Sequence, residues 1–356
     1  MKRDLWLRCE TKEKEKRTPL TPKEAKELVD LGIKVTVEDD PDRIFKIEEY
    51  KDVGCIIVEP GAWKSAPKEA FVLGLKEITE PGFDFFHNHI YFAHIYKGQN
   101  GSKDILKRYK KGNGCLFDLE YLTDNNGKRV AAFGHWAGFA GAAFALDRFF
   151  HKQNKENIYE LQSFPSVTKL KNHISIKREK ATFKNPKCII IGSLGRCGKG
   201  AEELLKMFDI KITSWDYQET KGGGPFLEIL EHDIFINAAL INKKIPPFLN
   251  NDIFINNNSN LSIISDVSCD PNSDLNPIPL YKKTTTWDKP FLEIENIKDL
   301  EVLSVDNLPS TLPRESSIDF SKQLFPHLKE LITSKDRLPT PFENALSVFK
   351  SHINEI

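Results

Sequence analysis

The stretch that decides the fold, residues 186–216, reads Pro-Lys-Cys-Ile-Ile-Ile-Gly-Ser-Leu-Gly-Arg-Cys-Gly-Lys-Gly-Ala-Glu-Glu-Leu-Leu-Lys-Met-Phe-Asp-Ile-Lys-Ile-Thr-Ser-Trp-Asp. A short run rich in β-branched residues, 188–191, ends at Gly192, and glycines recur at equal steps at positions 195 and 198. An amphipathic stretch, 201–208, and a second short strand-like run, 211–214, follow. This order of strand, glycine-rich turn, helix and strand predicts a dinucleotide-binding unit.

Each part of this stretch suits a dinucleotide. Glycines allow a tight turn and let a pyrophosphate approach the backbone with no Cβ in the way. The N-terminus of the following helix offers unpaired N–H groups and partial positive charge, and Arg196 adds a cation. Asp216 can accept hydrogen bonds from a ribose diol and repel a 2′-phosphate, which favours NAD over NADP. The spacing is one residue longer than G-x-G-x-x-G at its first step, so a glycine-rich turn without a ligand is the alternative.

Composition narrows the class of protein. A chain of 356 residues with 40% apolar content exceeds one ordinary core, so two domains are expected. A formal net charge of +0 without a long basic block argues against a nucleic-acid surface. The stretch 130–146 is too short and too polar to span a bilayer. The 6 cysteines form no C-x-x-C motif, and residues 1–20 are charged throughout, so we expect a cytoplasmic protein with reduced thiols, no membrane partner and no metal.

The rest of the chain alternates strand-like and helix-like segments. Strands are expected at 5–9, 33–37, 55–58, 71–75, 83–86, 114–117, 234–237, 263–267 and 300–305. Helices are expected at 22–31, 103–109, 131–150, 167–176, 320–331 and 342–353. Alternation of this kind is typical of parallel α/β domains.

Two stretches of the first half carry candidate chemistry. Lys76 and Glu77 follow an apolar strand, at the end where parallel sheets bind ligands. A solvated lysine at a strand end is the alternative for Lys76. The second stretch holds His87, His89 and His94 within eight residues. It fits a polar loop with one capping histidine, or a zinc site, although no cysteine or carboxylate is nearby in sequence to complete that site.

Three arginines are candidates for binding substrate carboxylates. A guanidinium fork matches a carboxylate through two hydrogen bonds, so Arg17, Arg129 and Arg314 can each serve in this way. For each of them taken alone, a surface salt bridge is the equally simple interpretation.

The chain resembles the NAD-dependent, lysine-forming saccharopine dehydrogenases nearly end to end. The resemblance is carried by Arg8-Cys9-Glu10-Thr11-Lys12, Leu20-Thr21-Pro22, Gly74-Leu75-Lys76-Glu77, Phe92-Ala93-His94, Asp118-Leu119-Glu120, Arg129-Val130-Ala131-Ala132-Phe133-Gly134, Ala137-Gly138-Phe139-Ala140-Gly141, Gly195-Arg196-Cys197-Gly198, Gly222-Gly223-Gly224-Pro225-Phe226, Phe235-Ile236-Asn237 and Leu308-Pro309-Ser310. The resemblance implies cleavage of saccharopine by NAD and water to lysine, 2-oxoglutarate and NADH, as the last step of lysine biosynthesis. We expect a monomer that acts on these small molecules.

The resemblance also implies roles for individual residues. Lys76 takes the proton from the secondary amine, and His94 is the acid–base group for imine hydration and collapse. The implied substrate-binding residues are Arg17, Lys76, Glu77, Gln99, Glu120, Arg129 and Phe133. The implied cofactor-binding residues are Lys128, Gly195, Arg196, Asp216, Thr220, Leu240, Val267, Val305, Asp306, Asn307 and Leu308. Lys128, Leu240 and Asn307 depart from the family pattern, where an arginine, a tyrosine and a histidine are familiar.

The expected architecture is α/β, with two Rossmann-like domains, parallel sheets and an interdomain cleft, as in alanine dehydrogenase and transhydrogenase. A substrate domain is expected over residues 1–130 plus 322–356, and the NAD-binding Rossmann domain over 131–321. Two rival functions remain open at this point. One is an alanine-dehydrogenase-like enzyme, and the other is a redox-sensing module that binds NADH without turnover.

Overall fold

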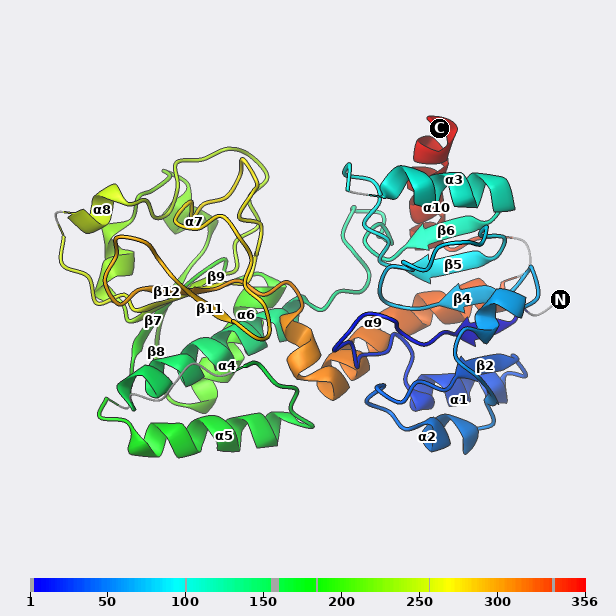
Figure 1. The fold of residues 1–356 in the computed structure, drawn as a ribbon, viewed down its shortest axis with the longest axis horizontal. Coiled ribbons are helices and arrows are strands. Elements are labelled where there is room, and N and C mark those ends of the chain that lie inside the picture. Colours follow the sequence, from blue (N-terminus) through cyan, green and yellow to red (C-terminus); the bar gives the residue numbers. More distant parts are fainter. Residues whose placement is uncertain (1–2, 100, 155–159, 184, 256, 335–336) are drawn as a thin grey trace. The chain divides into compact units, whose positions relative to one another are not determined.

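The computed structural model describes residues 3–99, 101–154, 160–183, 185–255, 257–334 and 337–356. The chain divides into two compact units, one formed by Met1–Ala132 with Pro313–Ile356 and the other by Phe133–Leu312. Each unit contains a six-stranded sheet (Figure 1). The expected domain boundary at 321/322 falls inside helix α9 (Pro313–Thr333), which belongs entirely to the first unit.

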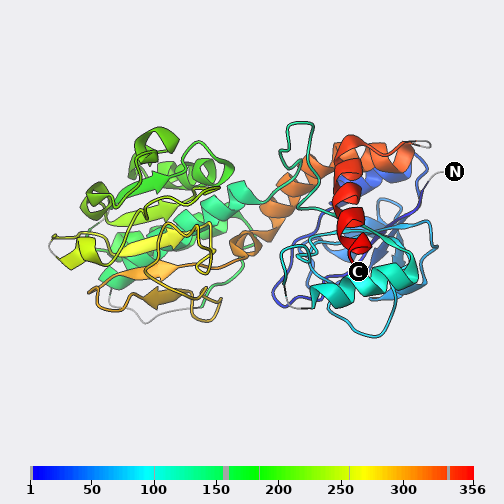
Figure 2. The same ribbon diagram turned by 90° about the horizontal axis from the view of Figure 1, so that it is seen from above.

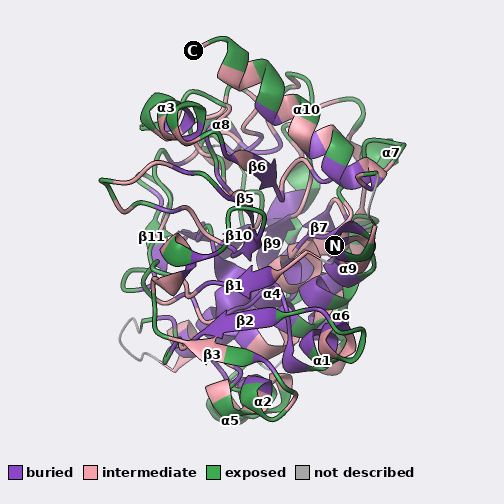
Figure 3. Cartoon of the chain, turned by 90° about the vertical axis from the view of Figure 1, so that its right-hand side faces the viewer, coloured by how far each residue is buried: buried purple, intermediate pink, exposed green. Residues whose placement is uncertain are grey.

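The first unit is built on a fully parallel sheet. Its strands, in the order in which they lie side by side, are β3 (Ile56–Val58), β2 (Val35–Glu38), β1 (Leu5–Leu7), β4 (Phe71–Leu73), β5 (Asn88–Tyr91) and β6 (Cys115–Asp118). The direction of winding reverses between β1 and β4, which creates a switch point at the carboxyl ends of these two strands. Figure 3 shows β1 and β2 as buried strands.

Helices from both ends of this unit's sequence cover the sheet. They are α1 (Pro22–Asp30), α2 (Ile47–Lys51), α3 (Ser102–Gly112), α9 and α10 (Thr340–Asn354), with a 3₁₀ turn at Ala62–Ser65. Helix α9 contacts α1, and α10 contacts β6 and α3. Figure 2 shows the red C-terminal helix beside the blue and cyan segments. The apolar side chains of α9 and α10, such as Phe320, Leu324 and Phe342, are fully buried, so the C-terminal segment completes this core.

The expected strand at 83–86 is wrong, because the strand of this region is β5, which includes part of the histidine stretch. His89 is fully buried, with the rings of Trp63, Phe85 and Tyr109 within 6 Å of its own. Burial lowers the pKa of His89 well below its usual range, so this histidine is neutral and acts as a core aromatic residue. The interpretation of this segment as a polar loop is therefore also wrong for His87 and His89.

The second unit also has a sheet whose winding reverses direction, with a different order of strands. Its strands lie in the order β11 (Phe291–Glu293), β12 (Glu301–Leu303), β10 (Ile263–Asp266), β9 (Ile234–Asn237), β7 (Lys187–Ile191) and β8 (Lys211–Trp215). Every pair is parallel except β11 with β12. The reversal lies between β7 and β9, next to the glycine-rich turn, which is the place where open α/β sheets bind ligands.

The helices of this unit include a very close crossing. They are α4 (Gly134–Gln153), α5 (Val167–Lys180), α6 (Arg196–Met207), α7 (Tyr217–Thr220) and α8 (Asp252–Ile255), with 3₁₀ turns at Leu227–Glu231 and Leu308–Thr311. A Cβ on Gly138 of α4 would lie 1.7 Å from the carbonyl oxygen of Cys197, and one on Gly200 of α6 would lie 1.9 Å from that of His135. The glycines therefore allow α4 and α6 to touch along their backbones. No helix in the described part of the chain is long and apolar enough to cross a membrane.

Candidate functional site

The candidate acid–base residues of the first unit lie at one edge of its sheet. Lys76 follows β4, His94 follows β5 and Glu120 follows β6. These strands are neighbours and parallel, so their carboxyl ends meet at the same edge. The fold thus places Lys76 and Glu120 at the same edge of the sheet, although they are 44 positions apart in the sequence.

Lys76 is held in a half-buried position. Its backbone N–H donates to Glu10 Oε2 at 2.9 Å, and its carbonyl oxygen accepts from Arg8 Nη2. Burial, and next the nearby guanidinium of Arg17, lower the pKa of the Lys76 ammonium. A lowered pKa favours the neutral amine, which can accept a proton from a substrate. The alternative of an ordinary solvated lysine does not fit this environment.

His94 is paired with Glu77. The Nδ1 atom of His94 lies 2.5 Å from Glu77 Oε1, and the two side chains are 42% and 32% exposed. Burial raises the pKa of Glu77, but the hydrogen bond from His94, a backbone hydrogen bond and the nearby charges of His94 and Lys12 together lower it to about 2. An ionised carboxylate only accepts, so Nδ1 carries the proton and Nε2 is left to exchange one with a ligand. Glu77 therefore fixes both the tautomer and the orientation of the ring.

The loops that follow β5 and β6 are joined by a further ion pair. Lys97 Nζ donates to Glu120 Oε1 at 2.9 Å, and this hydrogen bond raises the pKa of Lys97. The backbone N–H of Lys97 donates to Gln99 Oε1 at 2.8 Å. The predicted substrate residues Gln99 and Glu120 thus belong to the same group of loops as His94.

The three predicted carboxylate-binding arginines differ in their surroundings. Arg17 is 4% exposed, and its Nε and Nη2 donate to Glu15 at 2.7 and 2.6 Å. Arg129 is exposed on a turn that forms an antiparallel bridge with Thr123. Arg314 lies 3.7 Å from a carboxylate oxygen of Glu49 on α2, at the start of α9, which is the salt bridge of the simpler interpretation.

The glycine-rich turn of the second unit has the shape that a pyrophosphate requires. Gly192 has φ +90°, and a Cβ there would lie 2.5 Å from the backbone of Ala238. A Cβ on Gly198 would lie 2.3 Å from the carbonyl oxygen of Gly192. Gly195 is the N-cap residue of α6 and Arg196 is its first residue, so the helix directs its unpaired N–H groups at this turn. Glycines before the helix, at its N-cap and in its first turn leave the room that a dinucleotide phosphate needs.

Asp216 lies beside this turn, at the end of β8. Its carboxylate accepts from the backbone N–H of Leu194 at 2.9 Å and from that of Tyr217 at 2.9 Å. Thr220 Oγ1 donates to the carbonyl oxygen of Asp216 at 2.8 Å. The acid and the glycine-rich turn are thus linked directly, in the arrangement that suits a ribose next to a pyrophosphate.

The other predicted cofactor positions follow the remaining strands of this unit. Leu240, after β9, is 85% exposed, and Val267 follows β10. After β12, Asp306 is exposed, whereas Val305, Asn307 and Leu308 are buried. Asn307 Oδ1 accepts from Trp287 Nε1 at 2.7 Å, so this side chain supports its own loop. At the buried positions only the backbone is suited to contact a ligand.

Two predicted positions lie on either side of the boundary between the two units in the sequence. Lys128 is exposed on the turn after β6 in the first unit, where its backbone N–H donates to Asp124 Oδ1 at 3.0 Å. Phe133 is half-buried and is the N-cap residue of α4 in the second unit.

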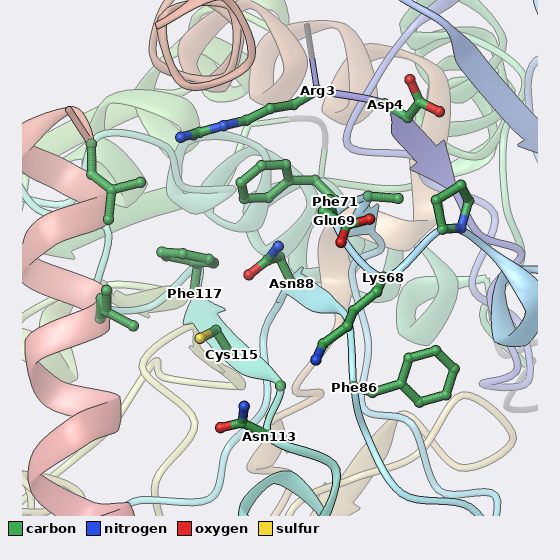
Figure 4. A pocket seen from close by; sticks show the side chains of 15 residues that line it. Arg3, Asp4, Lys68, Glu69, Phe71, Phe86, Asn88, Asn113, Cys115 and Phe117 are labelled. Carbon is green, nitrogen blue, oxygen red and sulfur yellow. The ribbon is translucent and has the colours of Figure 1, made fainter. Parts of the chain in front are cut away.

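A hollow of about 900 Å³ lies at the opposite edge of the first sheet (Figure 4). Phe71, Asn88 and Cys115, which line it, are the first residues of β4, β5 and β6. The described residues around it include no predicted site residue. Open parallel sheets bind their ligands at the carboxyl ends of the strands, so this hollow at the amino ends is not the candidate active site. Within the described residues, no three His, Cys, Asp or Glu side chains are grouped so as to hold a metal ion.

Two buried acids at the carboxyl edge of the first sheet were not predicted as site residues. Glu10 is 3% exposed and Asp118 is fully buried. Both belong to motifs that carry the family resemblance; Asp118 directly follows the apolar residues of β6, and Glu10 lies three residues after the end of β1. A polar residue at the end of a strand was the available signal, but it does not reveal what the side chain binds.

The chain matches known proteins over nearly its whole length. The family model of the alanine dehydrogenase/PNT N-terminal domain matches residues 6–140, and that of the C-terminal domain matches residues 225–350. The saccharopine dehydrogenase [NAD(+), L-lysine-forming] of Yarrowia lipolytica is 44% identical over 99% of this chain and 98% of its own. The enzyme of the same name from Emericella nidulans is 46% identical over 94% and 92%. The chain belongs to the saccharopine dehydrogenase [NAD(+), L-lysine-forming] family.

Solved structures agree with the fold of this saccharopine dehydrogenase family member. An L-alanine dehydrogenase superposes with a TM-score of 0.66 at 15% sequence identity, over 96% of this chain and 93% of its own. The transhydrogenase of Sinorhizobium meliloti gives a TM-score of 0.63 at 15% identity, over 97% of each chain. At this identity the likeness concerns the fold alone, and it confirms the expected α/β architecture with two Rossmann-like sheets.

Proposed function

We propose that Lys76 and His94 are the acid–base pair of an NAD-dependent cleavage of saccharopine to L-lysine and 2-oxoglutarate. Family membership makes the protein an oxidoreductase of this reaction. The observation that carries the assignment is the meeting of two different proton handlers at one sheet edge: a lysine with a lowered pKa and a histidine oriented by a carboxylate.

Lys76 acts at the oxidation step. When bound, NAD would accept the hydride that leaves the glutamyl α-carbon. The secondary amine must lose its proton as this carbon is oxidised to an imine, and the neutral amine of Lys76 takes that proton. Burial and the Arg17 guanidinium both favour the neutral form of Lys76, which is the form that this step requires.

His94 acts at the hydrolysis step. Water adds to the imine carbon, and Nε2 of His94 removes a proton from that water. The protonated imidazole then returns that proton to the nitrogen, which gives the carbinolamine. In the collapse, Nε2 takes the proton of the carbinolamine hydroxyl and passes it to the departing nitrogen, which yields 2-oxoglutarate and lysine. Glu77 accepts from Nδ1 throughout and stabilises the imidazolium that forms between these transfers.

The second unit holds the cofactor in this proposal. The glycine cradle and the N-terminus of α6 receive the pyrophosphate, with Arg196 beside it, and Asp216 accepts from the adenosine ribose. Leu240, Val267 and 305–308 provide the further contacts. The carboxylate at 216 would repel a 2′-phosphate, in keeping with the NAD(+) of the relatives' names.

Saccharopine carries three carboxylates, and we assign them to cations and polar groups of the predicted set. Arg129 is exposed and able to form a bidentate pair. The Nε and Nη2 edge of Arg17 is engaged by Glu15, so a substrate carboxylate has to use its other nitrogen or displace Glu15. Gln99, Glu120 and Phe133 are proposed as the surrounding contacts, and Lys128 is proposed as a contact of the cofactor.

Single substitutions of the proposed pair test this function. Lys76→Met and His94→Gln should each lower kcat for saccharopine oxidation by about 10²- to 10⁴-fold, because a positioned proton acceptor is lost. NAD affinity, measured by fluorescence titration, should change little. Lys68→Met, an exposed lysine beside the hollow at the opposite sheet edge, is the matched control and should keep full turnover. Unchanged saccharopine oxidation by Lys76→Met would show that the assignment is wrong.

The choice of substrate is tested by the reverse reaction. NADH oxidation should proceed with 2-oxoglutarate plus lysine and be far slower with pyruvate plus ammonia. Faster turnover of pyruvate and ammonia would favour the alanine-dehydrogenase-like alternative. Tight NADH binding without turnover of either pair would favour the sensing module.

We also propose that the protein is a cytoplasmic monomer. All six cysteines are free thiols, which agrees with a reducing compartment. Sedimentation velocity and fluorescence microscopy of a tagged chain test the two statements, and a dimer or an organellar signal would contradict them.

A further inference from the structure

Glu10 binds the peptide that carries Lys76. Its Oε1 accepts from the backbone N–H of Leu75 at 2.6 Å, and its Oε2 accepts from that of Lys76 at 2.9 Å. The carboxylate is 3% exposed. Each of its oxygens therefore holds one of two consecutive N–H groups, immediately after β4.

Arg8 holds the other side of the same peptide. Its Nη2 donates to the carbonyl oxygen of Lys76, while its Nη1 donates to that of Cys9 at 3.0 Å and lies 3.4 Å from Glu10 Oε2. A Cβ on Gly74 would lie 2.4 Å from the guanidinium carbon of Arg8, so only glycine lets this side chain cross β4. The glycine of the motif Gly74-Leu75-Lys76 thus leaves room for the side chain of Arg8.

Asp118 makes a matching arrangement next to His94. Its Oδ2 accepts from the backbone N–H of Ala93 at 3.3 Å, and its Oδ1 accepts from that of Glu120 at 2.9 Å. Asp118 is fully buried. His94, the next residue after Ala93, has φ 51°, a conformation that a residue with a side chain adopts only when its surroundings hold it.

We propose that Glu10 and Asp118 are positioning residues: two buried carboxylates that hold the backbone at Lys76 and at Ala93, the residue before His94, and so set the geometry of the acid–base pair. This inference rests on the proposed function of that pair. Arg8 acts together with Glu10, since its guanidinium pairs with the Glu10 carboxylate and donates to the carbonyl oxygen of Lys76.

The chemistry of the side chain explains why an acid is needed at both positions. A carboxylate offers two accepting oxygens to two N–H donors, whereas the isosteric amide offers one acceptor and one donor. In Glu10→Gln or Asp118→Asn, one backbone N–H then faces an NH₂ group, and the peptide must move or lose its partner. Burial raises the pKa of both acids, in Asp118 to about 6, which shows that the fold maintains these groups against a desolvation cost.

Glu38 provides a matched control. It is 1% exposed, and its carboxylate also accepts from two backbone N–H groups, those of Cys9 at 2.9 Å and Trp63 at 2.6 Å. It does not accept from the peptide of Lys76 or His94. Glu38→Gln creates the same mismatch of donors at the N–H groups of Cys9 and Trp63 and not at those of Leu75, Lys76 or Ala93, so it measures the structural cost of such a change.

The test compares Glu10→Gln, Asp118→Asn and Glu38→Gln in the full-length chain. Saccharopine oxidation is measured across pH, and rates are normalised to the sites that bind NAD. We expect kcat to fall by about 10²-fold in the first two variants, since a displacement of about 1 Å has that effect, with the KM for NAD unchanged. The pH profile of kcat should shift in both, and Glu38→Gln should lose stability while keeping kcat and the profile.

Three outcomes would overturn the inference. The first is full kcat in Glu10→Gln and Asp118→Asn, and the second is an equal fall of kcat in Glu38→Gln. If the two variants do not fold, Arg8→Lys replaces them, because a lysine keeps the cation but loses the fork that reaches both carbonyls, and an unchanged kcat in Arg8→Lys is the third. Lys76→Met separates this inference from the proposed function: if it retains activity, the proposed function itself fails.

Discussion

At the scale of single residues, the surroundings of Lys76 and of Glu77 favour different charge states in the two side chains. Burial and a guanidinium favour the neutral form of Lys76, while a hydrogen bond from His94 favours the ionised form of Glu77. A lysine with a lowered pKa and a glutamate with a lowered pKa thus occupy consecutive positions. Such divergent environments are how one site obtains two proton handlers at the same pH.

The Glu77–His94 pair should make stability depend on pH. The pKa of Glu77 in the folded protein, about 2, is below its ordinary value of 4.5. Its stabilising effect is therefore present above pH 4.5 and lost as the pH falls toward 2. The carboxylate is about one-third exposed, which reduces the expected effect to on the order of 1–2 kcal/mol. Urea unfolding of the wild type and Glu77→Gln should show a larger difference at pH 6 than at pH 3, and a constant difference would contradict this.

Asp216 should determine the choice of cofactor. Asp216→Ala removes both the acceptor for the ribose and the repulsion of a 2′-phosphate, so we expect NAD to bind about 10- to 100-fold more weakly and the preference against NADP to relax. Asp216→Asn is the companion variant, because it removes the charge and keeps one acceptor for the N–H of Leu194. Titration with both cofactors measures the ratio. An unchanged ratio of NAD to NADP affinity in both variants would contradict this role.

The residues of the proposed site are easier to predict from the sequence than the groups with which they form hydrogen bonds. The positions of Lys76 and His94 follow from strand ends and from family resemblance. The bidentate pair of Arg17 with Glu15, and the two N–H groups held by Glu10, do not follow from any local pattern. Glu10 and Lys76 are 66 residues apart, so their contact depends on how β1 and β4 pair.

At the scale of elements, most strands and helices are where the pattern of apolar residues predicts them. The stretch from β7 to β8 is confirmed in every part. Strand β5 was missed because a histidine counts as polar in a pattern, although His89 is buried among aromatic rings. The antiparallel β11 was also missed, since three residues are too few to show a period. Helix α9 begins earlier than expected, with Pro313 as its first residue.

Because α4 and α6 touch along their backbones, adding one methyl group at Gly138 should lower the stability of the second unit. In Gly138→Ala the new Cβ would overlap the carbonyl oxygen of Cys197, which is backbone and cannot rotate away. We expect a loss of about 2–3 kcal/mol in the stability of the second unit and weaker NAD binding, because Cys197 lies in the first turn of α6. Gly222→Ala, where a Cβ meets nothing within 4 Å, is the control. Equal denaturation midpoints for the two variants would show that the helices can separate at little cost.

At the scale of the whole molecule, the residues proposed to bind the cofactor and those proposed for acid–base chemistry belong to different units. The glycine cradle lies in Phe133–Leu312, and the acid–base residues lie in the unit formed by both ends of the chain. A chain that stops at residue 312 lacks α9 and α10, whose buried residues complete the first core. We expect this chain to keep NAD binding while amides of β1 to β6 exchange freely. Hydrogen exchange measured by mass spectrometry tests this, and protected amides in β1 to β6 would contradict it.

The discontinuous first unit also has a consequence for how the protein is made. A ribosome delivers the N-terminal 132 residues early, but α9 and α10, which complete the core of this unit, emerge only after the intervening unit has been translated. The nascent chain must therefore keep an incomplete α/β layer soluble while the inserted unit folds. Chaperones that shield exposed apolar surface should associate with it during this interval, and release should coincide with the appearance of the last helix.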